Sequence, residues 1–118
     1  LHGFREDASR CYDSFDVTLL TSSTEGLPNV LIESQARGVP VISTDVGGVN
    51  ESLEDGSTGI LLKNTDQESI GMMIGTMLDG WSMKDAAKLC KNFIKQKFGM
   101  ERMSKDTRDV YESLLSSR

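Results

Sequence analysis

Two glutamates in one short stretch are the residues of this chain best placed to do chemistry together. Glu25 and Glu33 lie in "SSTEGLPNVLIESQARGVPVISTD" (residues 22–45), with seven residues between them. Glu25 stands beside Gly26, as a loop residue would, whereas Glu33 is flanked by apolar residues. A carboxylate in an apolar segment is costly unless something hydrogen-bonds it. Because a carboxylate can accept two hydroxyl hydrogens at once, a ligand with a vicinal diol is a natural partner.

The helix that we expect over residues 28–38 relates both carboxylates to an anion. Pro28 suits the first helical position and Gly38 the position after the last. Free N–H groups and the positive end of the helix dipole would stabilise an anionic group, commonly a diphosphate, at the N-terminus. Glu33 then lies ~7.5 Å along the helix axis, which is about the distance from a nucleotide's phosphates to its ribose. Glu25 would face whatever is attached to the other end of the diphosphate.

Each of these residues also has a plain structural interpretation, which the sequence leaves open. Glu33 could reach water or pair with Arg37 one turn further on. Glu25 could be a solvated loop carboxylate or a cap for the helix start. Gly47 and Gly48 could form a simple tight turn, or bring a backbone edge close to the ligand's sugar or phosphate.

The elements that must position these residues alternate between strand and helix as far as residue 63. Short apolar runs are typical of buried parallel strands, and we expect them over residues 16–23, 39–45 and 58–64. Helices are expected over residues 5–14, 28–38, 49–56, 66–80, 82–98 and 100–115. This order predicts an α/β fold with a Rossmann-like parallel sheet and a helical C-terminal tail. Both candidate loops would lie at the carboxyl edge of the sheet, where such sheets bind ligands, and further strands are expected before Leu1.

Composition restricts the function further. The 118 residues suffice for one domain, and a net charge of −5 argues against a non-specific nucleic-acid binder. No apolar run approaches the length of a membrane span. Cys11 and Cys90 lie on separate predicted helices, and we expect both to be reduced and buried, which favours a cytoplasmic setting. The methionine stripe Met72, Met73 and Met77 is expected to fill the core.

Several phosphate and metal motifs are missing from the sequence. It contains no Asp-x-Asp pair for a divalent metal, no Cys/His cluster for zinc, and neither a P-loop nor a G-x-G-x-x-G motif. We therefore expect no metal and no cofactor. A diphosphate would have to be held by backbone groups, a helix dipole and basic side chains, few of which lie near the two loops.

A combination of motifs extends over most of the chain. The pattern E-G-[FL]-P-x-x-x-x-E-A-x-A-x-G-x-P-V is matched from Glu25 to Val41, with Ser34 where Ala is usual. "GG" with Glu51 and "DGSTGILL" follow, and "FGMERMSKDTRDVYESLL" closes the chain. Together they resemble the retaining glycosyltransferases of family 4, which have the two-domain GT-B fold. The last segment is similar to that family's final helix, which packs back toward the N-terminal domain.

This resemblance implies a role for each matched residue. Residues 1–118 would be a partial C-terminal donor domain, without the acceptor-binding N-terminal domain. Glu33 would bind the ribose hydroxyls of a nucleotide-sugar donor, and Glu25 would be the catalytic residue that contacts the transferred sugar. The backbone against sugar and diphosphate would be that of Gly26, Leu27, Pro28, Asn29 and Val30, with Gly47 and Gly48 in a second donor loop.

The resemblance also implies what the whole protein does. It would transfer a hexose from a nucleotide-diphosphate sugar to an acceptor, with retained configuration and no obligatory metal, in polysaccharide, lipopolysaccharide or glycolipid synthesis. Its setting would be the cytoplasm, at the inner face of the membrane. Because the family's phosphate-neutralising Arg and Lys precede this chain, we expect the chain alone to be inactive. Its open sheet edge invites a dimer.

Two other classes were considered. A non-catalytic Rossmann-like module that pairs with a partner would not need both Glu25 and Glu33. A nucleotide-sugar epimerase has a similar fold, but that family lacks the Glu-Gly-Leu-Pro signature. The base, the sugar and the acceptor are not identified by the sequence.

Overall fold

Three parallel strands form the centre of the molecule. The computed structural model describes residues 3–117. The strands are β1 (Thr18–Leu20), β2 (Val41–Thr44) and β3 (Gly59–Leu62), in the order β1-β2-β3. Both pairings are parallel, so the predicted α/β fold with a parallel sheet is confirmed for the described part of the chain.

The register is fixed by small residues as well as by apolar ones. Val41 is the partner of Thr18 on one side and of Gly59 on the other. A Cβ atom at Gly59 would lie 2.5 Å from the carbonyl oxygen of Val41. The close approach of β3 to β2 at this point therefore requires a glycine.

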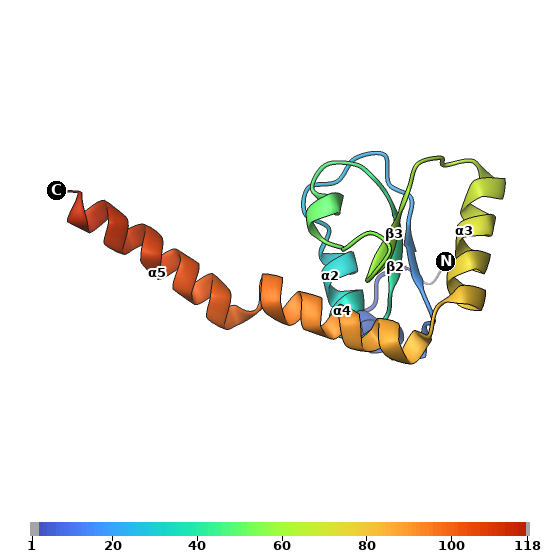
Figure 1. Cartoon of the computed structure of the whole chain (residues 1–118), viewed down its shortest axis with the longest axis horizontal. Helices are drawn as coiled ribbons and strands as arrows, with labels where there is room; N and C mark the ends of the chain where they lie inside the picture. The colour runs from blue at the N-terminus through green and yellow to red at the C-terminus, as the bar shows by residue number, and fades with distance from the viewer. Residues whose placement is uncertain (1–2, 118) are drawn as a thin grey trace.

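Helices cover both faces of the sheet (Figure 1). The elements are α1 (Ala8–Cys11), the 3₁₀ turn η1 (Tyr12–Ser14), α2 (Asn29–Ala36), the 3₁₀ turn η2 (Val49–Glu51), α3 (Gln67–Gly80), α4 (Met83–Phe98) and α5 (Met100–Ser116). Figure 1 shows α2 and α4 on one face of the sheet and α3 on the other. The longer predicted helices are present. The helix expected over residues 5–14 is reduced to the four residues of α1 followed by η1, and the one expected over residues 49–56 is only a three-residue 3₁₀ turn.

The central strand supplies the core of both layers. Val41 packs in a cluster with Leu31, Val49 and Leu53, on the face covered by α2. Its neighbour Ile42 points the other way and packs with Leu62 and Met77 beneath α3. Successive strand residues face opposite sides of a sheet, and each fully buried apolar side chain contributes about 2 kcal/mol. The continuous apolar run in the sequence follows from burial on both faces.

Buried polar side chains fix α2 in place. The Ser34 hydroxyl lies 2.8 Å from the Thr18 hydroxyl in β1. The amide nitrogen Nε2 of Gln35 donates to the Ser52 carbonyl at 2.6 Å, just beyond η2. Gly38 ends the helix with a φ of +84°, as predicted, whereas Pro28 occupies the N-cap and not the first helical position. These contacts hold α2 against both β1 and η2.

The predicted burial of the cysteines and methionines is only partly correct. Cys90 is buried and Cys11 is half-buried, and both are free thiols. Met73 and Met77 pack into the core under α3, but Met72 is 60% exposed because it lies on the outer side of that helix. The prediction that Met72 fills the core is therefore wrong.

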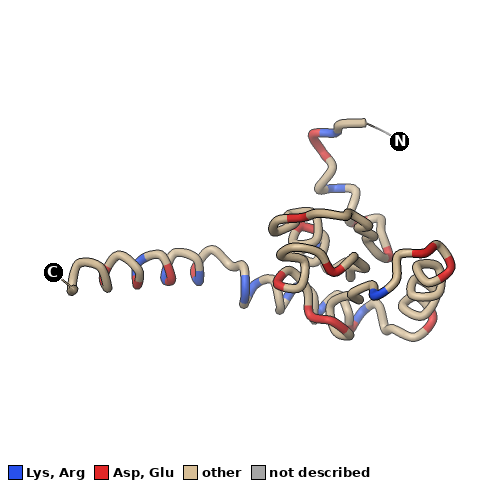
Figure 2. The backbone as a smooth tube through the Cα atoms, turned by 90° about the horizontal axis from the view of Figure 1, so that it is seen from above, with Lys and Arg blue, Asp and Glu red and all other residues tan. Residues whose placement is uncertain are grey.

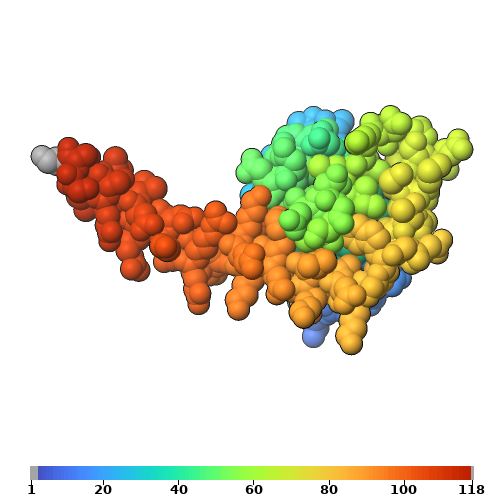
Figure 3. Space-filling model, in the orientation of Figure 1, coloured from blue at the N-terminus to red at the C-terminus, as the bar shows by residue number. Residues whose placement is uncertain are grey.

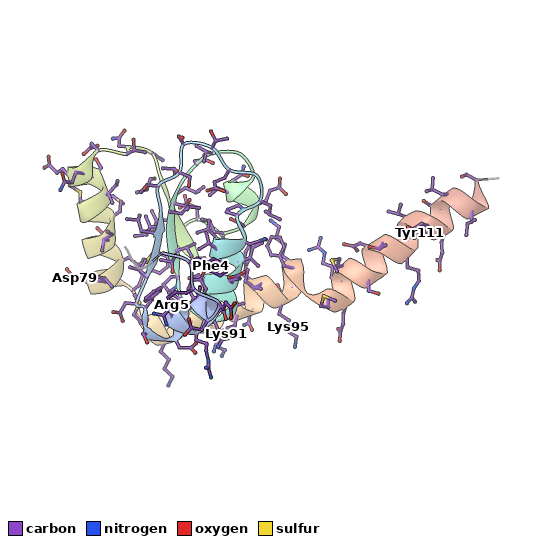
Figure 4. The ribbon with its side chains drawn as sticks, turned by 180° about the vertical axis from the view of Figure 1, so that it is seen from behind. Phe4, Arg5, Asp79, Lys91, Lys95 and Tyr111 are labelled. Atoms are coloured by element: carbon purple, nitrogen blue, oxygen red, sulfur yellow. The ribbon has the colours of Figure 1, made fainter. Side chains whose placement is uncertain are left out.

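Helix α5 projects away from the rest of the molecule (Figures 1 and 3). Gly99 separates α4 from α5 with an extended ψ of 144°. The amphipathic spacing predicted for residues 100–115 is present, but no residue of α5 is buried. Tyr111, labelled in Figure 4, is 65% exposed. None of the described helices is long and apolar enough to cross a membrane.

Candidate functional site

The loops that follow β1 and β2 meet at the carboxyl edge of the sheet. The backbone N–H of Gly48 donates to the carbonyl oxygen of Gly26 at 2.9 Å. The two loops lie side by side at the top of Figure 1. The expectation that parallel connectivity brings both loops to one edge is confirmed.

Glu25 lies within this contact between the loops. Its side chain is partly buried, and the backbone of Gly47 packs directly against its carbonyl oxygen. Glu25 makes no ion pair with any residue between 3 and 117. Its carboxylate is therefore available to a ligand at this edge.

Glu33 occupies an exposed position on α2. The helix turns Leu31, Ser34 and Gln35 inward, where all three are fully buried. Leu31 and Val30 thus pack into the core, and the expectation that apolar residues surround Glu33 is wrong. The carboxylate needs no ligand to offset burial, but it is accessible to one.

The neighbour of Glu33 is Tyr12 of η1. Tyr12 is buried, and its burial together with the adjacent Glu33 carboxylate raises the pKa of the Tyr12 hydroxyl. Arg37 pairs instead with Asp13, at 3.2 Å between nitrogen and carboxylate oxygen. The Glu33–Arg37 pair left open by the sequence is therefore not formed. Tyr12 escaped the sequence analysis because its role depends on how η1 packs against α2.

The N-terminus of α2 is open. Its N-cap residue is Pro28, and no side chain caps the helix. The amide of Leu31 bonds back to the Pro28 carbonyl at 3.2 Å, whereas those of Asn29 and Val30 have no acceptor among residues 3–117. By contrast, Asp66 caps α3 and Ser82 caps α4. An open N-terminus beside Glu25 and Gly26 is suited to an anion.

The side chains at the start of α2 and just before it differ in exposure. Pro28 is buried, and Val30 packs against the cluster that contains Leu31. Leu27 and Asn29 are exposed. A ligand at the helix N-terminus would therefore meet the backbone of this segment and the exposed side chains of Leu27 and Asn29.

A polar hollow of about 320 Å³ lies at the ends of all three strands, and the sequence analysis missed it. Its lining is Thr21, Ser22, Ser23, Thr44, Asp45, Val46, Leu62, Lys63 and Thr65. The signal for it was the polar residue that follows each strand, namely Thr21, Asp45 and Lys63. Lys63 is the one basic residue in this lining, and neither Glu25 nor Glu33 is part of it.

The electrostatics of this end of the molecule are acidic. The charged residues of the two loops are Glu25 and Asp45, both acidic, and Figure 2 shows acidic positions distributed over the body of the molecule. Within residues 3–117, no group of three or more His, Cys, Asp or Glu side chains is arranged to hold a metal ion. An anion here would depend on backbone N–H groups and the α2 dipole.

Comparison with known proteins identifies the family of the chain. A family model described as "Glycosyl transferases group 1" matches residues 1–79. A Salmonella typhi Vi polysaccharide biosynthesis protein is 32% identical over 105 residues, covering 86% of this chain and 18% of that protein. An Escherichia coli UDP-Gal:alpha-D-GlcNAc-diphosphoundecaprenol alpha-1,3-galactosyltransferase is 25% identical, over 100% of this chain and 30% of its own length.

Solved structures share the fold. Anabaena HepE in complex with UDP superposes with a TM-score of 0.85 at 23% identity, over 95% of this chain and 31% of that chain. Sucrose-phosphate synthase from Thermosynechococcus elongatus gives a TM-score of 0.80 at 24% identity, over 92% and 27%. The chain thus spans less than a third of the length of these relatives.

Proposed function

The chain belongs to the glycosyl transferases of group 1, and on this premise we propose that it binds the nucleotide-sugar donor of a retaining hexosyltransferase. Its fold is that of the C-terminal part of a GT-B glycosyltransferase. The observation that carries the proposal is the position of Glu25 at the open N-terminus of α2, with Glu33 accessible further along the same helix.

The proposed site has three parts in line. The free amides of Asn29 and Val30, with the α2 dipole, receive the diphosphate. Glu33 accepts hydrogen bonds from the two ribose hydroxyls, and Glu25 accepts them from the transferred sugar. Negative charge develops on the diphosphate as the sugar leaves, and the same amides stabilise it. This stabilisation of charge does not need a metal ion bound by the described residues.

The relatives support a hexose donor. The HepE structures include complexes named for UDP and glucose and for UDP-glucose. Other relatives are named as a galactosyltransferase and as proteins of polysaccharide biosynthesis. We propose a related role for the whole protein, in polysaccharide, lipopolysaccharide or glycolipid synthesis in the cytoplasm at the inner face of the membrane.

The sheet itself supports the proposal that this chain works as part of a larger protein. The outer edge of β3 is closed, because Gly56 donates to the Gly59 carbonyl and Asp55 accepts from the Leu61 amide, both at 2.9 Å. The outer edge of β1 has no partner strand in the part of the chain that the structure describes. We propose that further strands of the donor domain pair with β1, and that an N-terminal domain covers the apolar face of α5.

The test is the nucleotide affinity of the full-length protein with Glu33→Ala. Loss of a hydrogen-bonded carboxylate partner costs about 1–3 kcal/mol, so we expect the Kd of the preferred nucleoside diphosphate to rise roughly 5- to 150-fold. Glu68→Ala, an exposed glutamate on α3, is the matched control and should leave the Kd unchanged. UDP, GDP and ADP should each be titrated by calorimetry. Unchanged affinity for all three would refute the ribose assignment.

One observation supports a second candidate function. The exposed apolar face of α5, which includes Val110, Tyr111 and Leu114, suits a module that docks on a partner. If the full-length protein binds no nucleoside diphosphate, a non-catalytic interaction module replaces the enzyme as our conclusion.

A further inference from the structure

We infer that Gly47 and Gly48 are positioning residues, which seat the peptide that carries Glu25. In this view the loop after β2 acts through the loop after β1 and need not touch the donor. The inference rests on the proposed function, which gives the Glu25 carboxylate a sugar to contact.

Gly47 meets two separate requirements for glycine. Its φ of +55° is a conformation that residues with a Cβ rarely adopt. A Cβ atom there would overlap the carbonyl oxygen of Glu25 and press on its carbonyl carbon at 2.8 Å. The backbone of Gly47 therefore lies in direct contact with the Glu25 peptide.

Position 48 requires glycine only because there is no space for a Cβ atom. Its φ of −87° is open to any residue. Its N–H donates to the Gly26 carbonyl at 2.9 Å, and a Cβ atom would lie 2.7 Å from that same oxygen. A side chain of any size here must push the Gly26 carbonyl away and lengthen the hydrogen bond.

The two loops in this contact differ in how firmly they are held. A Cβ atom at Gly26 would meet nothing within 4 Å, whereas the carbonyl groups of Glu25 and Gly26 lie against Gly47 and Gly48. The loop after β2 is anchored, because Val49 is fully buried and its amide bonds to the Val46 carbonyl at 3.2 Å. The Glu25 peptide therefore takes its position from the loop after β2.

The same anchor reaches α2. Nε2 of Gln35 donates to Ser52 at 2.6 Å, and the Ser52 amide donates to the Val49 carbonyl at 2.9 Å. The turn η2 thus contacts the Glu25 loop through Gly48 and the Glu33 helix through Ser52. This double attachment sets the spacing between the two carboxylates.

The effect of disturbing it should fall on turnover. A misplacement of about 1 Å in a catalytic group can cost on the order of 100-fold in rate. Gly48→Ala in the full-length protein should therefore lower kcat roughly 10- to 100-fold. Nucleotide affinity should stay within about 3-fold, because Glu33 and the amides of α2 are held by other contacts. Because a general loss of folded protein would also lower the kcat per total enzyme without changing Kd, the nucleotide-binding stoichiometry from calorimetry must be used to express kcat per folded molecule.

The experiment compares glycines that differ in their surroundings. Gly71→Ala in α3, where a Cβ meets nothing within 4 Å, is the control for Gly48→Ala. Gly56→Ala, with a φ of +80° and open space, is the control for Gly47→Ala, since it carries the same backbone strain without the overlap. Both controls should retain kcat. Equal kcat in Gly48→Ala and Gly71→Ala would overturn the inference.

Two further measurements separate the possible failures. Amide hydrogen exchange on the unmodified protein should show the Gly48 amide protected, whether or not the variants fold, and exchange at open-loop rates would overturn the inference. Glu25→Ala should depress kcat while sparing nucleotide affinity. If it does so and Gly48→Ala has no effect, the seating role fails and the proposed function stands. If Glu25→Ala retains full turnover, the proposed function fails.

Discussion

The most demanding prediction concerns Gln35→Glu, a change of one atom type at the junction between α2 and η2. Gln35 is fully buried. Its Nε2 donates to the carbonyls of Leu31 at 2.8 Å and Ser52 at 2.6 Å, and its Oε1 has no partner. In the variant, a carboxylate oxygen faces two carbonyl oxygens at a fully buried position. Burial and these two acceptors raise the pKa of the new carboxyl well above its usual range.

The magnitude follows from that geometry. Ionising a fully buried carboxyl at neutral pH costs on the order of 4 kcal/mol, the consequence of a strongly raised pKa. The folded-state pKa exceeds the unfolded-state value, so stability is retained at pH below about 4 and is lost as pH rises through the folded-state pKa. Denaturant unfolding of the full-length protein between pH 4 and 8 measures this loss of stability. Gln35→Met, which removes donor and orphan acceptor together, should cost about 1 kcal/mol at every pH.

The matched control for the charge is Gln67→Glu, at the exposed first position of α3. A carboxylate there should leave the free energy of unfolding unchanged or raise it slightly, since it lies at a helix N-terminus. If Gln35→Glu and Gln67→Glu unfold at the same denaturant concentration at pH 7, the amide of Gln35 does not lie between the two carbonyls and the link from α2 to η2 is refuted.

Two further predictions concern the chain as it stands. Titration of residues 1–118 with UDP, GDP or ADP should give millimolar binding or none, together with no transferase activity; a micromolar Kd in calorimetry would contradict the need for further cationic groups. Burial raises the pKa of the Cys90 thiol to about 12, so that iodoacetamide at pH 8 should spare Cys90 in the native protein and modify it after unfolding. Because this pKa is raised above its unfolded value, the associated stability is present at neutral pH and is lost as pH climbs toward 12. Rapid native modification of Cys90, read by peptide mass, would count against its burial.

The sequence was sufficient for the three strands, for the longer helices and for the edge at which the loops meet. Continuous apolar runs predicted β2 and its neighbours, because a strand buried on both faces needs no alternation. The same reasoning misjudged Glu33, because a list of flanking residues does not say which of them a helix turns inward. Leu31 and Gln35 are buried while Glu33, between them in sequence, is exposed.

Contacts between separate segments could not be predicted from the sequence, for a different reason. The proximity of Tyr12 to Glu33 and the packing of Gly47 on Glu25 join residues far apart in sequence. Two glycines in a row predict a turn, but they do not identify the carbonyl groups that need the space. Helix α5 shows the converse: its amphipathic pattern was correct, yet a pattern cannot say that the apolar face lacks a partner among the described residues.

The charge balance of the site decides how it must work. A nucleoside diphosphate at the N-terminus of α2 would sit near two carboxylates, Glu25 and Glu33, on a chain with a net charge of −5. The α2 dipole offers only about 0.3–1 kcal/mol to a nearby anion. Lys63 is the one basic side chain in the hollow at the strand ends. The two carboxylates can therefore accept hydrogen bonds from hydroxyl groups of the ribose and the sugar, but they repel the diphosphate between them. We therefore expect the affinity for the donor to depend on cationic groups beyond those of residues 3–117, with Glu25 and Glu33 selecting the donor more than they hold it.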